Sequence, residues 1–335
     1  MTKTPIEGIH HVTAIASDAQ ANVDFYVGLL GLRLVKRTVN FDDPGTYHLY
    51  YGDEAGTPGS ILTFFPWAHA VRGTRGVGQT SATAFSVPEG SLGFWRDRLA
   101  GQNVLAAEPA DRLERESVLT LFDPDGMKLE LIAHPGAEDR APWAGSGIPE
   151  RAAIRGFHSV TLTEKSLGPT TGLLTEAMGF HRVVSEGDAG EGDGGGNRSR
   201  YAIGAGGAGA QIDLLEEPSG SHGRVAAGSV HHVAFRVEDD AAQRAWLADL
   251  AERGLHVTPV QDRQYFHSIY YREPGGVLFE LATDPPGFTF DEPLASLGSA
   301  LKLPPWLEAA RPRIEAALPK LQVPAAAPAV AEGVA

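Results

Sequence analysis

Short stretches of strand-like alternation recur along the chain, and each is followed by residues with helical spacing. Residues 12–15 show the two-residue period of a half-buried strand. Ser17 or Asp18 can cap a helix after it, and Gly31 can end that helix. One apolar helical face follows the spacing i, i+3, i+4 and i+7 and consists of Val23, Tyr26, Val27 and Leu30. The pattern predicts a strand followed by a short helix.

The same order of elements is predicted near the other end of the chain. Residues 233–237 are rich in strand-forming side chains, a helix is predicted over residues 239–253, and Gly254 ends it. Three further strands follow each helix, and a turn precedes the last strand, as in Pro124-Asp125-Gly126 and Pro274-Gly275-Gly276. Each unit therefore has the order strand, helix, strand, strand, strand.

The chain also repeats its own sequence, and internal repeats define an architecture. Gly8-Ile9-His10-His11-Val12-Thr13 resembles Gly156-Phe157-His158-Ser159-Val160-Thr161. Ala84-Phe85-Ser86-Val87 resembles Ala234-Phe235-Arg236-Val237, and residues 123–131 align with residues 273–281 at the same offset. The chain thus contains four modules, in which the first resembles the third and the second resembles the fourth.

We predict an α+β fold of four βαβββ modules that form two pseudo-symmetric domains of paired curved sheets. The first pair of modules covers residues 1–138, a linker covers 139–154, the second pair covers 155–290, and a C-terminal extension with an Ala/Pro-rich tail covers 291–335. Several Pro, Gly and charged residues between 135 and 155 are typical of a linker. The Gly-rich residues 186–210 predict a long mobile hairpin loop, with no helix start that would make a phosphate cradle. The tail beyond Lys320 is expected to be disordered.

Composition and charge exclude several classes of partner. Hydrophobic residues make up 42% of the chain, enough for a sizeable core. The net charge of -14 repels phosphate backbones and anionic lipid, so neither nucleic acid nor a membrane is expected as a partner. An apolar run of about 18 residues is missing, as is a signal-like N-terminal segment, which favours a cytoplasmic location. Without cysteine, a metal site must use nitrogen and oxygen ligands.

The repeat breaks at residues suited to binding a metal. Three pairs of positions align between the modules: His11 with Ser159, His232 with Ala82, and Glu280 with Glu130. If the first module pairs with the fourth, one cavity collects two histidines and one carboxylate. The opposite pairing, of the third module with the second, collects a serine, an alanine and a carboxylate, which cannot hold a metal. Duplication of a scaffold would leave one site that can bind a metal and one that has lost its ligands.

Two neutral imidazoles and one carboxylate on one face of a metal leave about three coordination positions open. This set suits Fe(II) that binds a substrate and O2 together, and it also suits Mn(II) or a Lewis-acid metal that chelates vicinal oxygens. A lone histidine on a strand is more often a core residue. Adjacent strand residues point to opposite faces, so at most one histidine of each His-His pair should point at a cavity centre. Glu280 lies in an apolar strand and needs a partner, and Glu130 has the same need, which a cation can also meet.

These motifs resemble the vicinal oxygen chelate superfamily, which includes glyoxalase I, type I extradiol dioxygenases and bleomycin-resistance proteins. As far as about Pro319, the chain resembles the ring-cleaving dioxygenases of this superfamily that act on para-hydroquinones. The matching segments are Ile9-His10-His11-Val12-Thr13, Val35-Lys36-Arg37-Thr38-Val39-Asn40-Phe41, Tyr47-His48-Leu49-Tyr50-Tyr51, Gly56-Thr57-Pro58-Gly59, Gly156-Phe157-His158-Ser159, His231-His232-Val233-Ala234-Phe235, residues 275–280 and Ser296-Leu297-Gly298.

The resemblance implies Fe(II)-dependent insertion of O2 into a hydroquinone ring, with cleavage beside one hydroxyl. It places the family's metal ligands at His11, His232 and Glu280. It places catalytic and substrate-side positions at His10, Thr13, His231, Arg263 and Tyr270. Ordinary extradiol enzymes take their first histidine from the third module, where this chain has Ser159, and this departure argues against the common catechol arrangement. His158 would need a register shift to serve.

Each of these side chains has a role that its chemistry allows. Thr13 shares a strand face with His11, so its hydroxyl can reach the cavity. Arg263 could stabilise a hydroquinonate oxygen, or it could form an ion pair at the sheet edge with Asp262 or Glu273. Tyr270 could donate a proton or a hydrogen bond, or it could be a core aromatic residue.

His10 and His231 could orient the ligands or act as acid and base near neutral pH. Strand alternation should turn them away from their neighbours. We interpret His48, His256 and His267 as ordinary residues, although His267 is close in sequence to the site.

Two alternative functions remain open at this point. One is a metal-dependent lyase or isomerase of the glyoxalase kind, although such sites usually carry two carboxylates and only Glu280 can be assigned. The other is a ligand-binding protein without turnover, which would often have lost a ligand that this chain retains. The small-molecule partners expected here are an aromatic substrate and O2. The sequence leaves open the ring substituents, the choice between Fe(II) and Mn(II), and whether the chain forms a homo-oligomer.

Overall fold

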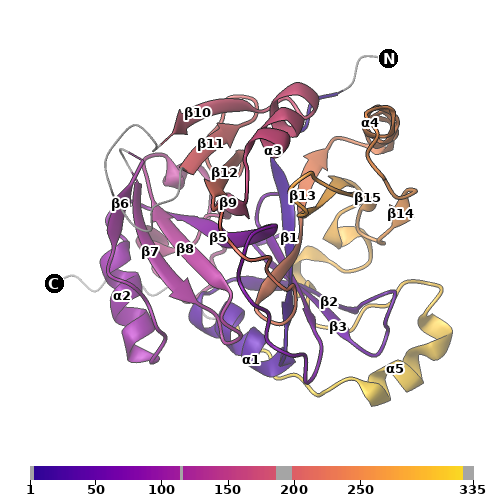
Figure 1. Cartoon of the computed structure of the whole chain (residues 1–335). Helices are drawn as coiled ribbons and strands as arrows, with labels where there is room; N and C mark the ends of the chain where they lie inside the picture. The colour runs from indigo at the N-terminus through magenta and orange to yellow at the C-terminus, as the bar shows by residue number, and fades with distance from the viewer. Residues whose placement is uncertain (1–3, 114–115, 186–197, 327–335) are drawn as a thin grey trace.

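A computed structural model of the chain describes residues 4–113, 116–185 and 198–326. The strands of these residues lie in two curved, eight-stranded sheets, seen at the left and right of Figure 1. One sheet has the order β14-β15-β16-β13-β1-β4-β3-β2, and the other has the order β10-β11-β12-β9-β5-β8-β7-β6. Helices are few and lie outside the sheets (Figure 1). The predicted α+β fold of two pseudo-symmetric halves is confirmed.

All four predicted modules have the order strand, helix and three strands. The first contains β1 (Ile9–Ala16), α1 (Ala19–Val23) with a π-helical turn (Asp24–Leu29), β2 (Arg33–Val39), β3 (Tyr47–Gly52) and β4 (Ile61–Pro66). The second contains β5 (Gln79–Val87), α2 (Leu92–Gly101), β6 (Ala110–Arg112), β7 (Glu116–Phe122) and β8 (Lys128–Ala133). The third contains β9 (Phe157–Glu164), α3 (Gly168–Gly172) with a π-helical turn (Leu173–Ala177), β10 (His181–Ser185), β11 (Arg198–Ala202) and β12 (Gln211–Glu216). The fourth contains β13 (Ser229–Val237), α4 (Asp240–Glu252), β14 (Gln261–Asp262), β15 (His267–Arg272) and β16 (Leu278–Thr283).

Each sheet combines one module from each half of the sequence. Antiparallel pairing of β1 with β13 joins the first module to the fourth, and pairing of β5 with β9 joins the second to the third. The pairing on which the metal-site hypothesis depends is therefore present. It also means that a division of the chain near residues 139–154 separates strands that belong to the same sheet.

The helix ends follow the predicted capping residues. Asp18 caps α1 by accepting a hydrogen bond from the Ala21 amide, and Gly31 follows the helix with a φ of 72°, which favours glycine. Asp239 caps α4 in the same way, and Gly254 follows it with a φ of 85°. Sequence signals alone were sufficient at these positions because capping is a local interaction.

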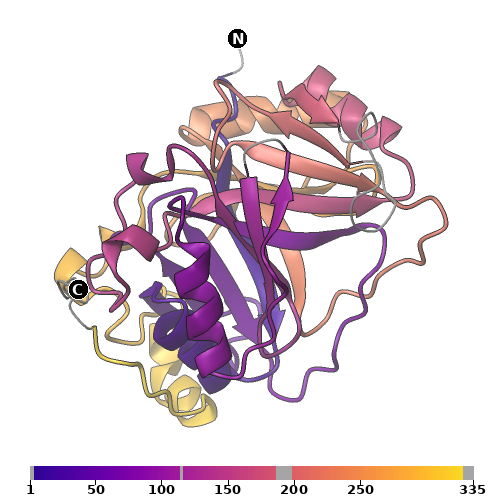
Figure 2. The same cartoon turned by 90° about the vertical axis from the view of Figure 1, so that its left-hand side faces the viewer.

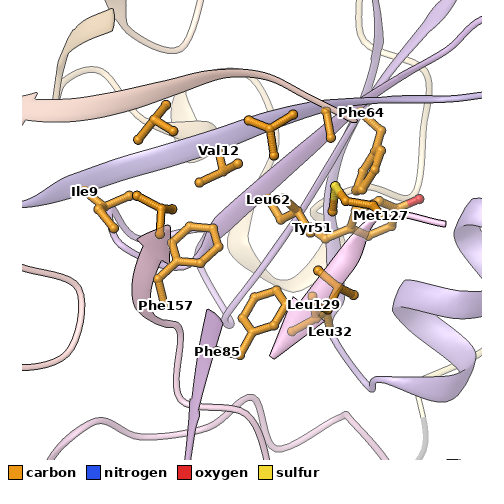
Figure 3. Packing of buried hydrophobic residues seen from close by; sticks show 14 of the residues in the cluster. Ile9, Val12, Leu32, Tyr51, Leu62, Phe64, Phe85, Met127, Leu129 and Phe157 are labelled. Carbon is orange, nitrogen blue, oxygen red and sulfur yellow. The ribbon is translucent and has the colours of Figure 1, made fainter. Parts of the chain in front are cut away.

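The main core lies between the facing surfaces of the two sheets. Figure 3 shows Ile9 and Val12 of β1 and Leu62 of β4 on one side, with Phe85 of β5 and Phe157 of β9 on the other. These five side chains are at most 1% exposed. Burial of each stabilises the fold by roughly 1.5–3 kcal/mol. The packed core holds the central strands β1 and β13 in a rigid position.

The segment between the second and third modules packs into this core. It contains two short 3-10 turns, Ala137–Asp139 and Glu150–Ala152, but it is not an exposed spacer. Its buried residues include Ala137, Ile148, Ala152, Ala153 and Ile154. The Pro and Gly content that suggested a linker here reflects an irregular backbone whose apolar side chains are nevertheless needed by the core.

As far as residue 326, the C-terminal extension runs along the first module (Figures 1 and 2). Lys36 of β2 is fully buried and forms ion pairs with Asp291 at 2.7 Å and Glu292 at 2.9 Å. Beyond α5 (Arg311–Ala317), the backbone of Gln322 exchanges hydrogen bonds with the side chain of Gln20. The predicted disorder of the tail thus does not begin at Lys320, and residues 327–335 lie outside the described part.

Two further predictions concern the Gly-rich loop and membrane-spanning helices. Residues 186–197 of the predicted Gly-rich loop fall outside them, and residues 203–210 form the turn between β11 and β12. No helix in the described ranges is long and apolar enough to cross a membrane.

Candidate metal centre

The three predicted metal ligands come from three adjacent strands of one sheet. His11 lies on β1, His232 on β13 and Glu280 on β16. In the strand register, Ala234 is opposite both His11 and Glu280. The ladder therefore brings together residues that are far apart in the chain, and all three are at most 5% exposed.

The ligand atoms of these residues converge on one point. His232 Nε2 lies 2.9 Å from Glu280 Oε2, His11 Nε2 lies 3.3 Å from the same oxygen, and the two Nε2 atoms are 3.3 Å apart. Two ligand atoms at about 2.1 Å from one metal and at right angles lie about 3.0 Å apart. Among the described residues, this is the group of three His, Cys, Asp or Glu side chains whose ligand atoms are within 4.8 Å of one another. The spacing fits a single divalent ion.

The two oxygens of Glu280 have different surroundings. Oε1 accepts a hydrogen bond from the Ser268 hydroxyl on β15. Oε2 faces the two imidazoles but accepts no well-aligned hydrogen bond from the part of the chain that the structure describes. Burial would raise the pKa of this carboxyl, but His11 and His232 hold it well below its usual value. A buried carboxylate oxygen that lacks a well-aligned donor fits a metal ligand.

A second histidine lies behind each ligand histidine. His10 Nδ1 is 2.9 Å from His11 Nδ1, and His231 Nδ1 is 2.8 Å from His232 Nδ1. A metal-bound Nε2 requires the proton on Nδ1, which can then be donated to the neighbouring bare Nδ1. Burial, with the adjacent ligand histidine, lowers the pKa of His10, and it lowers that of His231 to about 3. Both neighbours are therefore neutral hydrogen-bond acceptors.

Strand alternation predicted that neighbouring histidines would point apart, and this expectation was too strict. The β1 ladder shifts register between Ile9 and His11, so the regular alternation is broken there. On β13, both His231 and His232 line the same cavity. A local bulge and the length of an imidazole allow each pair to remain in contact.

A cavity of about 350 Å³ opens onto the ligand histidines. Of the predicted catalytic residues, Thr13, His231, Arg263 and Tyr270 line it, whereas His10 does not. The rest of the lining mixes aromatic and polar side chains: Asn40, Phe41, Asp42, His48, Tyr50, Phe65, Trp67, Thr258, Gln261, Phe266 and Leu278. An aromatic cavity with a few polar groups suits a small ring that carries hydroxyls.

Arg263 and Tyr270 form a contact pair in the cavity wall. The guanidinium carbon lies 5.6 Å from the centre of the Tyr270 ring. The ion-pair partner of Arg263 is Asp42 at 3.1 Å, and not Asp262 or Glu273 as the sequence suggested. Asp42 belongs to the loop after β2, which the sequence could not place beside β14. Burial, followed by Glu280, raises the pKa of Tyr270, so its phenol is protonated at neutral pH.

His48 was treated as an ordinary residue, but it lines the cavity together with Tyr50. Tyr50 Oη lies 2.8 Å from His48 Nδ1. The only sequence signal for this pair was the family motif Tyr47-His48-Leu49-Tyr50-Tyr51. The other two histidines behave as predicted: His256 is exposed, and His267 pairs with Asp240 at 2.6 Å, outside the cavity lining.

The equivalent positions in the other sheet carry no metal set. Glu130 of β8 instead forms ion pairs with Arg112 at 2.8 Å and Lys128 at 3.0 Å, as the alternative of a cation partner predicted. His158 pairs with Glu116 at 3.0 Å. In this sheet, buried salt bridges hold the carboxylates of Glu130 and Glu116.

Comparison with known proteins places this geometry in a family. Residues 8–131 and 156–281 match the family model described as Glyoxalase/Bleomycin resistance protein/Dioxygenase superfamily. A Bacillus subtilis (strain 168) protein named "Putative ring-cleaving dioxygenase MhqO" is 46% identical over 94% of this chain and 97% of its own. A protein of Sphingobium indicum, named "Chlorohydroquinone/hydroquinone 1,2-dioxygenase", is 38% identical over 90% of this chain and 93% of its own.

Solved structures agree with this assignment. A crystal structure of a "putative dioxygenase" from Bacillus subtilis subsp. subtilis str. 168 superposes with a TM-score of 0.88 at 44% identity, covering 96% of this chain and 99% of that one. Glyoxalase I from Zea mays superposes with a TM-score of 0.61 at 13% identity, over 83% of this chain and 92% of that one, and so shares the fold.

Proposed function

The chain belongs to the glyoxalase/bleomycin resistance protein/dioxygenase superfamily, and from this membership and its His-His-Glu cluster we propose that it is an Fe(II)-dependent dioxygenase that cleaves the ring of a para-hydroquinone. The broader class, an aromatic ring-cleaving dioxygenase, is confirmed by relatives of that name at 38% and 46% identity over nearly the whole chain. The choice of para-hydroquinone follows the name of the Sphingobium relative and the absence of a histidine at Ser159.

The observation that carries the proposal is the convergence of His11, His232 and Glu280 beside an aromatic cavity that the two histidines line. A facial set of two histidines and one carboxylate leaves positions for a substrate oxygen and for O2 on the same ion. Fe(II) bound there would supply the activation of O2. Mn(II) would fit the same ligands, so the choice of Fe(II) over Mn(II) is part of the proposal.

The cavity has room for more than a bare ring. A cavity of about 150 Å³ holds benzene in a protein interior, and the cavity here measures about 350 Å³. Phe41, Phe65, Trp67 and Phe266 supply aromatic walls for the ring faces. A ring with one or more small substituents fits this volume better than unsubstituted hydroquinone.

The predicted catalytic residues have matching positions for such a substrate. Arg263 presents a positive charge to the cavity and can hold an anionic ring oxygen. Tyr270, protonated at neutral pH, can donate a hydrogen bond or a proton to an oxygen beside the ligands. His10 and His231 keep the ligand imidazoles in the tautomer that leaves Nε2 free.

Oxygen uptake by protein loaded anaerobically with Fe(II), and in parallel with Mn(II), tests the proposal. Substituted para-hydroquinones and catechols are offered side by side, and the ring-opened product is followed by its absorbance. Uptake with para-hydroquinones supports the proposal and defines the substrate. Uptake with catechols alone would keep a dioxygenase but reject the substrate class. No uptake by metal-bound protein would favour a glyoxalase-type lyase or a ligand-binding protein.

A further inference from the structure

Four hydroxyl and imidazole groups form one continuous hydrogen-bonded row beside the metal centre. Tyr50 Oη lies 2.8 Å from His48 Nδ1, His48 Nε2 lies 2.8 Å from Thr63 Oγ1, and Thr63 Oγ1 lies 2.9 Å from Thr13 Oγ1. Strand register creates the row, because Thr63 of β4 is opposite Thr13 of β1 and also opposite Tyr50 of β3. His48 lies two residues from Tyr50 and therefore on the same face of β3.

The row has only two fully satisfied arrangements of its protons. A neutral imidazole donates from one nitrogen and accepts at the other, and a hydroxyl has one proton to donate. Thr63 is fully buried, so its proton must point either to His48 or to Thr13. In one arrangement every group donates toward Thr13, and in the other every group donates toward Tyr50.

Both ends of the row face the same cavity. Thr13 and Tyr50 line it, as does His48, whereas Thr63 does not. Thr13 is also opposite His232 in the β1–β13 ladder, which places it next to a metal ligand. When the row donates toward Tyr50, the Thr13 oxygen can accept a proton from a hydroxyl in the cavity.

From this geometry we propose that Thr13, Thr63, His48 and Tyr50 form a proton relay that deprotonates the bound diol. The substrate hydroxyl transfers its proton to Thr13, Thr13 transfers its own to Thr63, and Thr63 transfers its own to His48 Nε2. The Nδ1 proton of His48 passes to Tyr50, and the Tyr50 phenol proton passes to a water molecule in the cavity. Every relay atom gains one proton and loses one, so the only net change is an ionised substrate and a hydrated proton.

The relay needs no charged histidine, and the site disfavours one. Burial lowers the pKa of His48 well below its ordinary value, and His11, His232 and Arg263 lower it further. Tyr50 likewise remains a phenol, because burial raises its pKa well above the ordinary value. Two neutral groups that each exchange a proton suit a concerted transfer.

The relay rests on the proposed function in one respect, namely that the ligand is a hydroxylated ring. A diol hydroxyl must lose its proton to bind a cation as an anion, so the site needs a path from that hydroxyl to a proton acceptor. Of the cavity groups, Arg263 and Tyr270 keep their protons at neutral pH and do not take one from the diol, whereas His231 and Asp42 also line the cavity and are the competing acceptors. The relay carries the proton along the neighbouring strands to the part of the cavity beside Tyr50, and Thr63→Val distinguishes this path from direct transfer to His231 or Asp42.

Thr63→Val is the sharpest test, because Thr63 does not line the cavity and valine has nearly the same shape. Thr63→Ser keeps the hydroxyl and serves as the conservative rescue. Thr83→Val is the matched control, since Thr83 is a fully buried strand residue of the other sheet whose hydroxyl has no hydrogen-bond partner among the described residues. Metal content is measured for every variant before assay.

Two readouts follow the relay. The first is the rate of proton release, recorded with a pH indicator when metal-loaded protein is mixed anaerobically with a para-hydroquinone. The second is kcat for oxygen uptake, measured in H2O and in D2O. Thr63→Val should slow proton release and lower kcat by roughly 10²-fold, which is the lower range for acid–base catalysis. Thr63→Ser should recover most of both rates, and Thr83→Val should match the wild type.

Each other outcome decides against the relay or against the dioxygenase. Wild-type rates and an unchanged solvent isotope effect in Thr63→Val would overturn the relay, and so would an equal loss in Thr63→Ser, which would indicate packing. Proton release by the wild type without oxygen uptake would reject the dioxygenase, while the variants would still test the relay. The absence of proton release from the wild type would overturn the relay outright.

Discussion

His11 and His232 are separated by 221 positions in the chain, yet their Nε2 atoms lie 3.3 Å apart. The contact exists because β1 and β13, the opening strands of the first and fourth modules, are neighbours in one sheet. Two imidazole nitrogens and a carboxylate oxygen held this close in a buried site would repel one another's lone pairs without a proton or a cation between them. The simplest occupant for the whole set is one divalent ion.

Loss of any one ligand should abolish metal retention. His11→Ala, His232→Ala and Glu280→Gln each remove one of the three converging atoms. The expected loss of affinity exceeds the roughly 10–100-fold effect of removing an outer hydrogen-bond partner. Metal analysis of each variant after dialysis measures this effect directly.

The matched control for those variants is Glu130→Gln in the other sheet. It removes the equivalent carboxylate charge, which is paired with Arg112 and Lys128. We expect it to retain the metal while lowering thermal stability, because two buried or half-buried cations lose their partner. Equal metal loss in Glu130→Gln would contradict the assignment of the metal to the sheet that contains β1 and β13.

His10 and His231, the neighbours of the ligand histidines, should change the affinity for the metal without binding it. His10→Leu removes the acceptor for the Nδ1 proton of His11 and should weaken metal affinity by roughly 10–100-fold. His267→Ala, which alters a histidine paired with Asp240 outside the cavity lining, should leave affinity unchanged. Titration with a competing chelator distinguishes the two, and unchanged affinity in His10→Leu would exclude this role.

Arg263 should act on the anionic form of the substrate. Arg263→Met keeps the apolar stem but removes the charge, so kcat/KM for a para-hydroquinone should fall by roughly 10²–10³-fold. Asp42→Asn should have little effect, because Asp42 is 76% exposed and its ion pair with Arg263 is weakened by solvent. Wild-type kcat/KM in Arg263→Met would show that the guanidinium serves only the ion pair.

Stability should depend on pH through two carboxyls that join the sheets. Glu164, at the end of β9, lies beside Glu273 in the turn before β16, and burial together with Glu273 raises the pKa of Glu164 to about 8. The folded protein therefore keeps a proton that the unfolded chain releases above its ordinary pKa of 4.5. Stability from this group is present below that value and is lost as the pH rises to about 8.

Glu164→Gln should remove this dependence, because an amide hydrogen-bonds without ionising. Between about pH 5 and pH 9, the melting temperature of the variant should fall less than that of the wild type, by a few degrees at 2–4 °C per kcal/mol for a domain of roughly 200 residues. Calorimetry across that range measures the difference. Parallel curves for the two proteins would mean that Glu164 does not share a proton with Glu273.

The sequence was sufficient for those features that depend on repetition and local chemistry. The internal repeat aligned His11 with Ser159 and His232 with Ala82, and these differences, with Glu280, predicted the candidate metal set before any strand was paired. Caps such as Asp18 and Asp239 were predictable because a capping residue bonds within its own first turn.

Features that depend on register could not be predicted in the same way. The contact of His48 with Thr63 depends on how β3 lies against β4, and a shift of one residue would place it on the other face. The Arg263–Asp42 ion pair joins a loop of the first module to the fourth module. The periodicity of the sequence contains no signal for such a contact between distant loops. The contact between His10 and His11 accompanies a register shift that alternation does not foresee.

The most direct test of the central claim is mass spectrometry of the product formed from a para-hydroquinone under isotope-labelled O2. A ring-cleaving dioxygenase predicts a ring-opened product that contains both labelled oxygen atoms, formed by the Fe(II)-loaded wild type and absent with Glu280→Gln. An unlabelled quinone or an unchanged substrate from metal-bound wild-type protein would contradict the account and leave a lyase or a binding protein as the function of this site.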